Sequence, residues 1–401
     1  MIRSPFAPFF PSLPVSGSYL DSAAKTLTCT AALEAQQRFY SEFDCNIERG
    51  IYARSALASD MVEGARADVA RLLGASPERV SFSPSTTHAL NSIALGLPWL
   101  AGMKVVTTVL EHHSNLLPWL ALRRRGVEIV VLGASPEGFL DPDDMREACD
   151  GAFLAAFTHA SNVTGSVQDL EALAGAAASA GAFVVVDGAQ WLSHSEVDIR
   201  SLPIDAYAFS GHKCFGPTGT GAVFVSAELR RALEPAILGG GSASDSSPEG
   251  FTTVEQPPHG ALEPGTQNIA GILGLGAAAA FRLGMDQDLR RRHMDDVASR
   301  CLEGLDGIEG LELHGPDGSK PRLPVFSFSV EGLSPHMLAM RLDQEYGIMT
   351  RSGNHCAPTL WRTLFGRSRG GVRASFHDYS CLADVDLLIT ALGRIASDAR
   401  R

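Results

Sequence analysis

The stretch "AFVVVDGAQ" (182–190) is a near-continuous apolar run that ends in a carboxylate and an amide. Such a run is typical of a β-strand buried on both faces of a parallel sheet. Similar runs alternate with helical stretches between about residues 60 and 226, and the other predicted strands are 79–84, 104–113, 127–133, 152–161, 206–211 and 221–226. This alternation predicts an α/β fold with a mostly parallel sheet and helices on both faces.

Polar residues follow the predicted strands at the points where they end. They comprise hydroxyls, imidazoles, amides, one carboxylate and one lysine, at 85–87, 111–113, 158–162, 187–190 and 210–213. Ligands of such sheets bind at the carboxyl ends of the strands. We therefore expect these residues to form a single site.

A second domain is expected after the sheet. Residues 236–268 are rich in Gly, Ser and Pro, and this length predicts a functional loop or an interface segment. New strands at 323–330 and 371–377, with helices between them, predict a smaller C-terminal α+β domain. The expected organisation is an N-terminal arm packing on the small domain, a large domain, and a small domain with a reactive-cysteine loop: 1–18, 19–268 and 269–401.

The composition limits partners and location. The 401 residues are 45% hydrophobic and 19% charged, with a formal net charge of −12. This charge disfavours nucleic acid or an anionic membrane as the main partner, because both bind basic surfaces. The N-terminal residues lack the apolar run of a signal peptide, and no apolar stretch is long enough to span a bilayer. Seven cysteines without a CxxC pair indicate neither a zinc site nor a disulfide framework, so we expect a cytoplasmic protein without a metal.

Lys213, in "FSGHKCFGPTG" (209–219), is one of only four lysines in a chain that prefers arginine. An amine can lose its proton when it is desolvated and can form a Schiff base, whereas a guanidinium cannot. Lys213 therefore indicates imine chemistry, for which pyridoxal 5'-phosphate (PLP) is the commonest partner. An ordinary surface lysine at a strand end is the simpler alternative.

The residues at the other strand ends favour PLP. Asp187 ends an apolar strand and can keep a pyridine nitrogen protonated. Hydroxyls at 85–87, before a predicted helix, suit a phosphate group, with Ser210 and His212 as further donors. Three other side chains suit the ring itself, one as a covering aromatic face and two as alternative partners of the phenolic oxygen: His112, Asn162 and Gln190.

Eight stretches, in order over nearly the whole chain, resemble the signature sequences of SufS-type (group II) cysteine desulfurases. These enzymes belong to the class V aminotransferase branch of fold-type I PLP enzymes. The stretches are "YLDSAA" (19–24), "EHHSNLLPW" (111–119), "THASNVTG" (158–165), "VDGAQ" (186–190), "FSGHKCFGPTGTG" (209–221), "EPGTQN" (263–268), "RSGNHCA" (351–357) and "VRASF" (372–376). The resemblance implies a large, mostly parallel, seven-stranded α/β/α domain, a smaller α+β domain, a homodimer and conversion of L-cysteine to L-alanine.

The resemblance also implies residue roles. Lys213 forms the Schiff base with PLP, Asp187 pairs with the pyridinium nitrogen, and His112 stacks on the ring. The other implied cofactor contacts are Gln190 and Asn162 at the phenolic oxygen, Thr87, Ser210 and His212 at the phosphate beside Thr86, and Thr266 of the partner subunit. Arg373 grips the substrate carboxylate, and the remaining expected substrate contacts are Arg351, Asn162 and Tyr52.

Cys356 decides which reaction follows. The resemblance makes it the nucleophile that takes sulfur from the substrate as a persulfide, before transfer to a possible acceptor protein. A reactive thiolate needs an exposed loop near cationic groups, and we expect Arg351 and His355 to supply them. The alternative is a buried cysteine that acts as a small hydrophobe, which Gly353 and Asn354 make less favourable.

Other functions remain open at this stage. Tyr52 and Asn354 stand where the family commonly has histidine, so the substrate and the proton-transfer steps are not fixed by the resemblance. The enzyme alternatives are a selenocysteine lyase, or a PLP-dependent β-eliminase or aminotransferase in which Cys356 is not the nucleophile. The glycine pattern "GILGLGAAAA" (271–280) fails as a dinucleotide-binding motif because it follows no strand of a βαβ unit. A sulfur-transfer scaffold without cofactor is disfavoured by Lys213 and Asp187.

Overall fold

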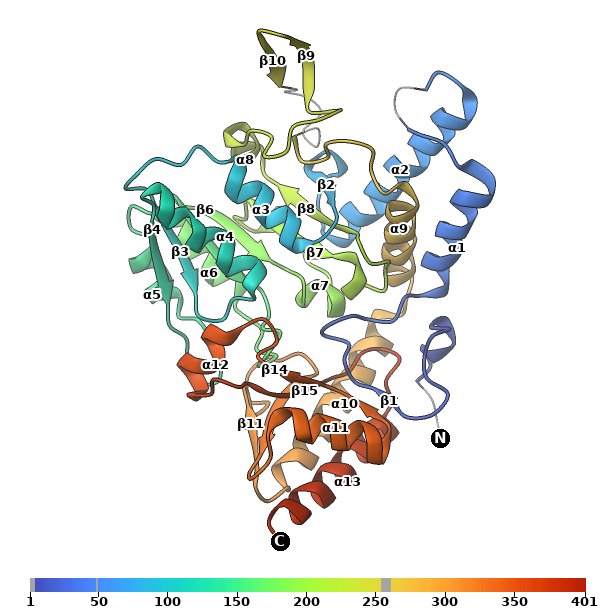
Figure 1. Ribbon diagram of the computed structural model, residues 1–401, viewed down its shortest axis with the longest axis vertical. Helices are drawn as coiled ribbons and strands as arrows, with labels where there is room; N and C mark the ends of the chain where they lie inside the picture. Colours follow the sequence, from blue (N-terminus) through green and yellow to red (C-terminus); the bar gives the residue numbers. More distant parts are fainter. Residues whose placement is uncertain (1–3, 48–49, 254–260) are drawn as a thin grey trace.

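The computed structural model describes residues 4–47, 50–253 and 261–401, and residues 254–260 of the expected interface segment lie outside this part. A seven-stranded sheet forms the centre of the larger part of the molecule (Figure 1). Its order is β2 (Val80–Ser83), β8 (Gly221–Val225), β7 (Ala206–Ser210), β6 (Phe183–Asp187), β5 (Leu154–Thr158), β3 (Lys104–Thr108) and β4 (Glu128–Leu132). Every neighbouring pair is parallel except the two that contain β8. The predicted α/β fold with a mostly parallel sheet is confirmed.

Helices cover both faces of this sheet because its strands are apolar on both sides. In β6, Val185 packs on one face, while Val184 and Val186 pack on the other. The Val185 face is covered by α3 (Thr86–Gly96), α4 (His113–Ala121) and α8 (Ala227–Ala232). The opposite face is covered by α2 (Ala53–Leu72), α5 (Pro142–Ala148), α6 (Leu170–Ser179) and α9 (Ile269–Leu283). Burial on both faces explains why the strands lack the alternation of a half-exposed sheet.

The smaller part of the molecule is built on a four-stranded antiparallel sheet. Its order is β11 (Leu311–His314), β12 (Val325–Val330), β15 (Gly371–Ser375) and β14 (Arg351–Gly353). The associated helices are α10 (Gln287–Asp306), α11 (Pro335–Tyr346), α12 (Pro358–Phe365) and α13 (Leu382–Ala399). In Figure 1 this part lies below the large sheet, next to the loops that follow its strands.

The N-terminal residues pack with the small part, and helix α9, near the expected domain boundary, packs with the large part. Strand β1 (Ser18–Tyr19) pairs with β13 (Ile348–Met349), and Leu20 is buried in the core of the small part. Helix α9 packs with α1 (Thr30–Arg38) and α2, on the large sheet's side. The packing therefore groups α9 with the large part, after the boundary expected at residue 268.

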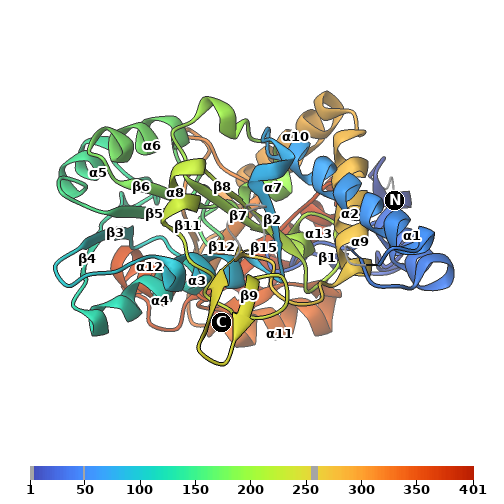
Figure 2. The ribbon, with the colours of Figure 1, turned by 90° about the horizontal axis from the view of Figure 1, so that it is seen from above.

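Two further features concern the periphery. The hairpin of β9 (Ala243–Ser247) and β10 (Gly250–Thr253) projects from the large part, away from the small one (Figure 1), and Figure 2 shows it from above. Among the residues that the structure describes, no single helix is long and apolar enough to cross a membrane, and only the bent pair α9 and α10 passes a combined test of length and composition.

Candidate active site

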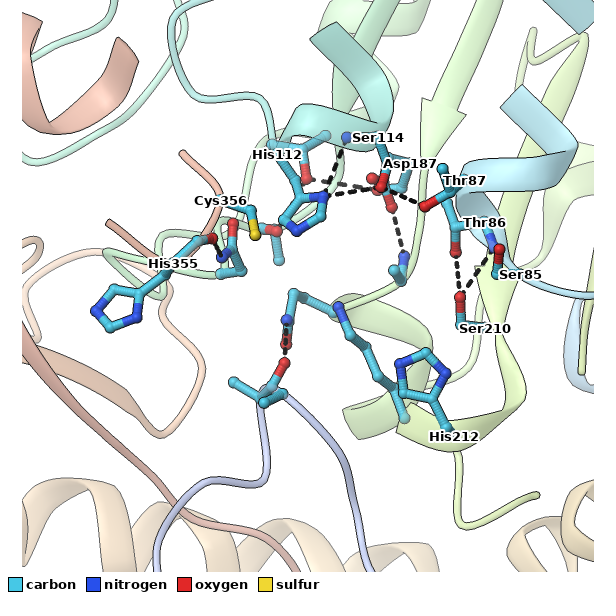
Figure 3. Close-up of a pocket in the computed structure, with 18 of the residues that line it drawn as sticks. Ser85, Thr86, Thr87, His112, Ser114, Asp187, Ser210, His212, His355 and Cys356 are labelled. Carbon is cyan, nitrogen blue, oxygen red and sulfur yellow. Dashed lines mark hydrogen bonds between the residues drawn. The ribbon is translucent and has the colours of Figure 1, made fainter. Parts of the chain in front are cut away.

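One cavity of about 260 Å³ lies at the carboxyl ends of the large sheet's strands, where loops of the small part close it (Figure 3). All predicted site residues line this cavity except Thr266 and Tyr52. Thr266 borders a neighbouring cavity with Ser83 and Gly221. Tyr52, half-exposed, precedes helix α2. A single chain therefore assembles nearly all of the predicted site.

A partly buried lysine and a buried carboxylate face this cavity from the ends of adjacent strands. Asp187 is the last residue of β6, and Lys213 lies in the turn after β7. Burial lowers the pKa of Lys213 and raises that of Asp187, and the charge of each partly opposes the shift of the other. Asp187 Oδ1 accepts a hydrogen bond from the Ala189 amide at 2.9 Å. The pocket thus holds an amine that loses its proton more readily than an exposed lysine.

The start of helix α3 forms a cradle of hydroxyls and amides. Ser85 caps the helix by accepting from the His88 amide at 3.2 Å. The Thr86 amide donates to Ser210 Oγ at 2.9 Å, and the two hydroxyls are 2.8 Å apart. Thr87 Oγ1 lies 2.6 Å from Ser114 Oγ. A helix N-terminus with hydroxyls beside it is a site for a phosphate group.

His112 caps helix α4 with its ring. Nδ1 accepts a hydrogen bond from the Ser114 amide at 3.1 Å and lies 2.9 Å from Ser114 Oγ. Burial, followed by the charge of Lys213, lowers the pKa of His112 to about 3. The ring is therefore neutral, and because Nδ1 is an acceptor the proton is on Nε2. Ser114 was not predicted from the sequence, although its place two residues after His112 at a helix start is a usable signal.

The two amide side chains of the site are anchored by backbone carbonyls of two different segments. Gln190 Nε2 donates to the Ala23 carbonyl at 2.8 Å, and its Oε1 is buried without a partner among the described residues. Asn162 Nδ2 donates to the His355 carbonyl at 2.8 Å. A buried acceptor without a partner is costly unless a ligand satisfies it. The lysine, the carboxylate, the phosphate cradle and this free acceptor together fit PLP.

Two arginines share one carboxylate at the side of the pocket formed by the small part. Arg373, on β15, is 2% exposed and donates Nη1 to the Asn162 carbonyl at 2.9 Å and Nη2 to Asp21 Oδ1 at 3.2 Å. Arg351 donates Nη2 to Asp21 Oδ2 at 2.8 Å. Arg373 Nε is buried without a hydrogen-bond partner in the described chain. Asp21 belongs to the quoted motif "YLDSAA", but its contact with both arginines was not predicted.

Cys356 lies in a strained turn between β14 and α12. His355 and Cys356 both have positive φ angles, 51° and 57°, in the left-handed region that side chains other than glycine rarely adopt. The Cys356 carbonyl accepts from the His113 amide at 2.8 Å. All seven cysteines are free and lie within the described residues, and Cys356 is the exposed one. The expected exposed thiol is therefore present at the pocket.

The ring of His355 does not provide the expected positive charge. It points away from Cys356 (Figure 3), is 8% exposed, and burial lowers its pKa well below the usual range. The His355 ring is buried whereas the neighbouring Cys356 is exposed, and the sequence does not reveal this difference. Arg351 remains charged, and its ion pair with Asp21 raises its pKa.

Comparisons with known proteins agree with this geometry. The aminotransferase class-V family model matches residues 18–388. The chain is 37% identical over 383 residues to a probable cysteine desulfurase of Methanothermobacter thermautotrophicus, covering 94% of each protein. It is 36% identical over 391 residues to cysteine desulfurase CsdA of Escherichia coli, covering 96% of this chain and 95% of the relative.

Solved structures give the same picture. The apo cysteine desulfurase of Thermococcus onnurineus superposes with a TM-score of 0.92 at 36% identity, covering 99% of each chain. Escherichia coli CsdA superposes with a TM-score of 0.88 at 35% identity, covering 98% of each chain. A C-DES mutant with glycine covalently linked to its PLP cofactor shares the fold, with a TM-score of 0.83 at 20% identity, 97% of this chain and 99% of that chain being covered.

Proposed function

We propose a mechanism for this chain from the premise that it belongs to the aminotransferase class-V family. The chain is a PLP-dependent cysteine desulfurase, which converts L-cysteine to L-alanine and removes its sulfur atom. The SufS-type subgroup remains the closest description suggested by its motifs. The roles of individual residues, given below, are our proposal.

PLP, when bound, supplies an aldehyde that condenses with amino groups and an electron-poor ring that stabilises the electron pair left at the substrate α-carbon. Lys213 would hold the aldehyde, Asp187 the ring nitrogen and Gln190 the phenolic oxygen. Asn162 would also approach the phenolic oxygen. The phosphate would lie at the start of α3, against Thr86, Thr87, Ser210 and His212. His112 would cover the ring with a neutral imidazole.

Lys213 moves the proton at the substrate α-carbon. Its Nζ is buried, and burial lowers its pKa, so that a larger fraction of the amine is unprotonated and able to act as a base. Asp187, at the end of the neighbouring strand, would hold the ring nitrogen in its protonated form. An exposed lysine would lack both conditions.

Arg373 binds the α-carboxylate of the substrate. Its Nε is buried and has no hydrogen-bond partner in the described chain, and a planar guanidinium suits a carboxylate. Asn162, whose carbonyl accepts from Arg373 Nη1, fixes the orientation of that guanidinium. Arg351 lines the same pocket at the entrance to the Cys356 loop.

Cys356 acts as the nucleophile, and the observation that carries this role is its exposed thiol in the same cavity as Lys213. The Cys356 thiolate attacks the sulfur of the substrate, and a sulfur–sulfur bond forms as the substrate Cβ–S bond breaks. The electron pair of the broken bond stays on the carbon skeleton, which takes up protons and leaves as alanine. The persulfide on Cys356 is then discharged by an acceptor thiol.

The test replaces the thiol and leaves the cofactor site intact. Cys356→Ala should keep the visible absorbance of bound PLP but lose alanine formation from L-cysteine and the mass gain of one sulfur atom on the protein. Cys45→Ala, which removes another free thiol outside the cavity, serves as the control and should keep both. Undiminished alanine formation in Cys356→Ala would refute the nucleophile assignment.

The same assay distinguishes the substrate alternatives. L-cysteine, L-selenocysteine and L-cysteine sulfinate are compared, and the organic product is identified as alanine or pyruvate. Alanine from L-cysteine with a persulfide on Cys356 supports the desulfurase mechanism. Pyruvate points to β-elimination, and activity confined to selenocysteine points to a lyase for that amino acid.

The assembly and location complete the proposal. We assign a homodimer in which Thr266 of the partner subunit reaches the phosphate, because Thr266 lies outside the cavity of its own chain. Tyr52 also lies outside the cavity of its own chain, and it stays a predicted substrate contact. The enzyme acts in the cytoplasm with a sulfur-acceptor protein, and sedimentation of the holoenzyme tests the dimer.

A further inference from the structure

Asp21 contacts both arginines of the pocket, and no other acidic side chain in the described part of the chain does so. Its carboxylate receives Arg351 Nε at 3.1 Å on each oxygen, Arg351 Nη2 at 2.8 Å on Oδ2, and Arg373 Nη2 at 3.2 Å on Oδ1. Its side chain is 17% exposed. A carboxylate that bridges two guanidiniums neutralises one of their two positive charges.

The backbone holds Asp21 in this place. It forms a parallel bridge with Ser375, two residues beyond Arg373 on the same strand. The Ser375 amide donates to the Leu20 carbonyl at 2.8 Å, and the Ala23 amide donates to Ser375 Oγ at 2.9 Å. These bonds on both sides of residue 21 fix its carboxylate relative to Arg373.

The charge of the substrate-binding wall follows from these contacts. Arg351 and Arg373 contribute two positive charges and Asp21 one negative charge, which leaves one positive charge. The imidazoles of His112 and His355 add none, because burial lowers both pKa values. Lys213 and Asp187 lie at the cofactor end of the cavity, where the proposed function has both of them engaged with PLP. One positive charge matches one α-carboxylate and leaves nothing to pair with a second anionic group.

We propose that Asp21 sets the charge class of the substrate, favouring amino acids with an uncharged side chain over those with an anionic one. The inference rests on the proposed function, in which Arg373 binds the α-carboxylate. A second carboxylate on the substrate would face Asp21 and a pocket whose positive charge is already matched. Without the Asp21 charge, Arg351 becomes free to pair with that second carboxylate.

The test measures binding of two amino acids that carry no sulfur, so its outcome does not depend on Cys356 chemistry. L-alanine and L-aspartate differ by one side-chain carboxylate, and each is titrated into the holoenzyme by the change in cofactor absorbance. In Asp21→Asn, the ratio of the dissociation constants of aspartate and alanine should fall by about tenfold, the effect of one unit charge in a partly screened site. An unchanged ratio would overturn the proposal.

Three further variants keep the test decisive. Asp21→Glu retains the charge and should leave the ratio within about twofold, and Asp143→Asn, at a side chain 85% exposed on α5, should do the same. Arg351→Gln removes a positive charge and should raise the ratio, opposite to Asp21→Asn. If Asp21→Asn does not fold, a ratio that stays unchanged in Arg351→Gln still refutes the proposal. Loss of desulfuration in Cys356→Ala, with these ratios intact, separates the two hypotheses.

Discussion

The strand ends proposed to hold the cofactor and the turn that carries Cys356 line one cavity but differ in burial and backbone geometry. Asp187 is buried and Lys213 is partly buried, and burial shifts the pKa values of both. Cys356 is exposed, and it and His355 have positive φ angles, each costing roughly 1–2 kcal/mol. The difference suits the two tasks, since a cofactor needs fixed partners whereas a thiol that receives sulfur must be reached by an acceptor.

The largest effect is expected from a substitution of Lys213, at the strand-end side of the cavity. Lys213→Arg keeps a positive charge but cannot form a Schiff base, so alanine formation should fall by at least about 10³-fold. The visible absorbance characteristic of lysine-bound PLP should also disappear. The rate at which iodoacetamide alkylates Cys356 should stay within about twofold of the unchanged chain, if the Cys356 turn does not depend on Lys213. Lys104→Arg, the same change at the start of β3, is the control, and retained turnover in Lys213→Arg would contradict the comparison.

A smaller effect is expected when the Cys356 turn is displaced. Gly370 has φ +69°, and a Cβ there would lie 2.1 Å from the Gly353 carbonyl oxygen. Gly370→Ala should therefore shift the turn and lower alanine formation by about tenfold to a hundredfold, with the cofactor absorbance unchanged. Both quantities are measured on the same holoenzyme.

Gly366 provides the matched control for this substitution. It has φ +62° and open space where a Cβ would be placed, so Gly366→Ala introduces similar backbone strain without the collision. It should keep most of the activity. Equal losses in Gly366→Ala and Gly370→Ala would show that strain near α12, rather than displacement of the turn, limits turnover.

The smallest effect is expected on folding stability, from the buried side chain of Glu111. Burial raises the pKa of Glu111 to about 8, and its carboxyl contacts Thr108, Asn115 and the Thr158 amide. The folded chain then keeps a proton that the unfolded chain releases above about pH 4.5. The contribution of Glu111 to folding stability is therefore expected to fall as the pH rises from about 4.5 to 8 and to level off above it.

Glu111→Gln should remove this contribution. Urea unfolding at pH 5, 6.5 and 8 should show a smaller loss of stability with pH in the variant, by a few kcal/mol at most. Glu309→Gln, at a side chain that is 85% exposed, should keep the slope of the unchanged chain. Identical slopes in all three proteins would show that Glu111 ionises normally.

Much of the cofactor half could be predicted from the sequence because its signals are local. The run "VVVD" at 184–187 predicts a buried strand that ends in a carboxylate. Lys213 and the hydroxyls at 85–87 likewise follow strands, and parallel strands bring their carboxyl ends to one edge. The cavity that contains them is thus a consequence of the strand pattern.

The contacts of the other half depend on distances along the chain that no local pattern contains. Asp21 meets Arg351 and Arg373 across 330 and 352 residues, and only the pairing of small-part strands brings them together. The direction of the His355 ring depends on a φ angle of 51°, which the letters Asn-His-Cys do not specify. Ser114 lies between these cases, since its position at a helix start was visible but its bond to His112 was not.

The separation along the chain also fixes the order in which a ribosome makes the site. The residues that would hold the cofactor within one chain, from Thr86 to Lys213, are synthesised before the thiol and the arginines. N-terminal regions tend to fold first during synthesis. Asp21 is synthesised early, but its two partners, Arg351 and Arg373, are synthesised near the end of the chain. Arg373 follows Lys213 by 160 residues in the sequence. A growing chain therefore lacks Arg351, Cys356 and Arg373, three residues that line the cavity, until synthesis is nearly finished.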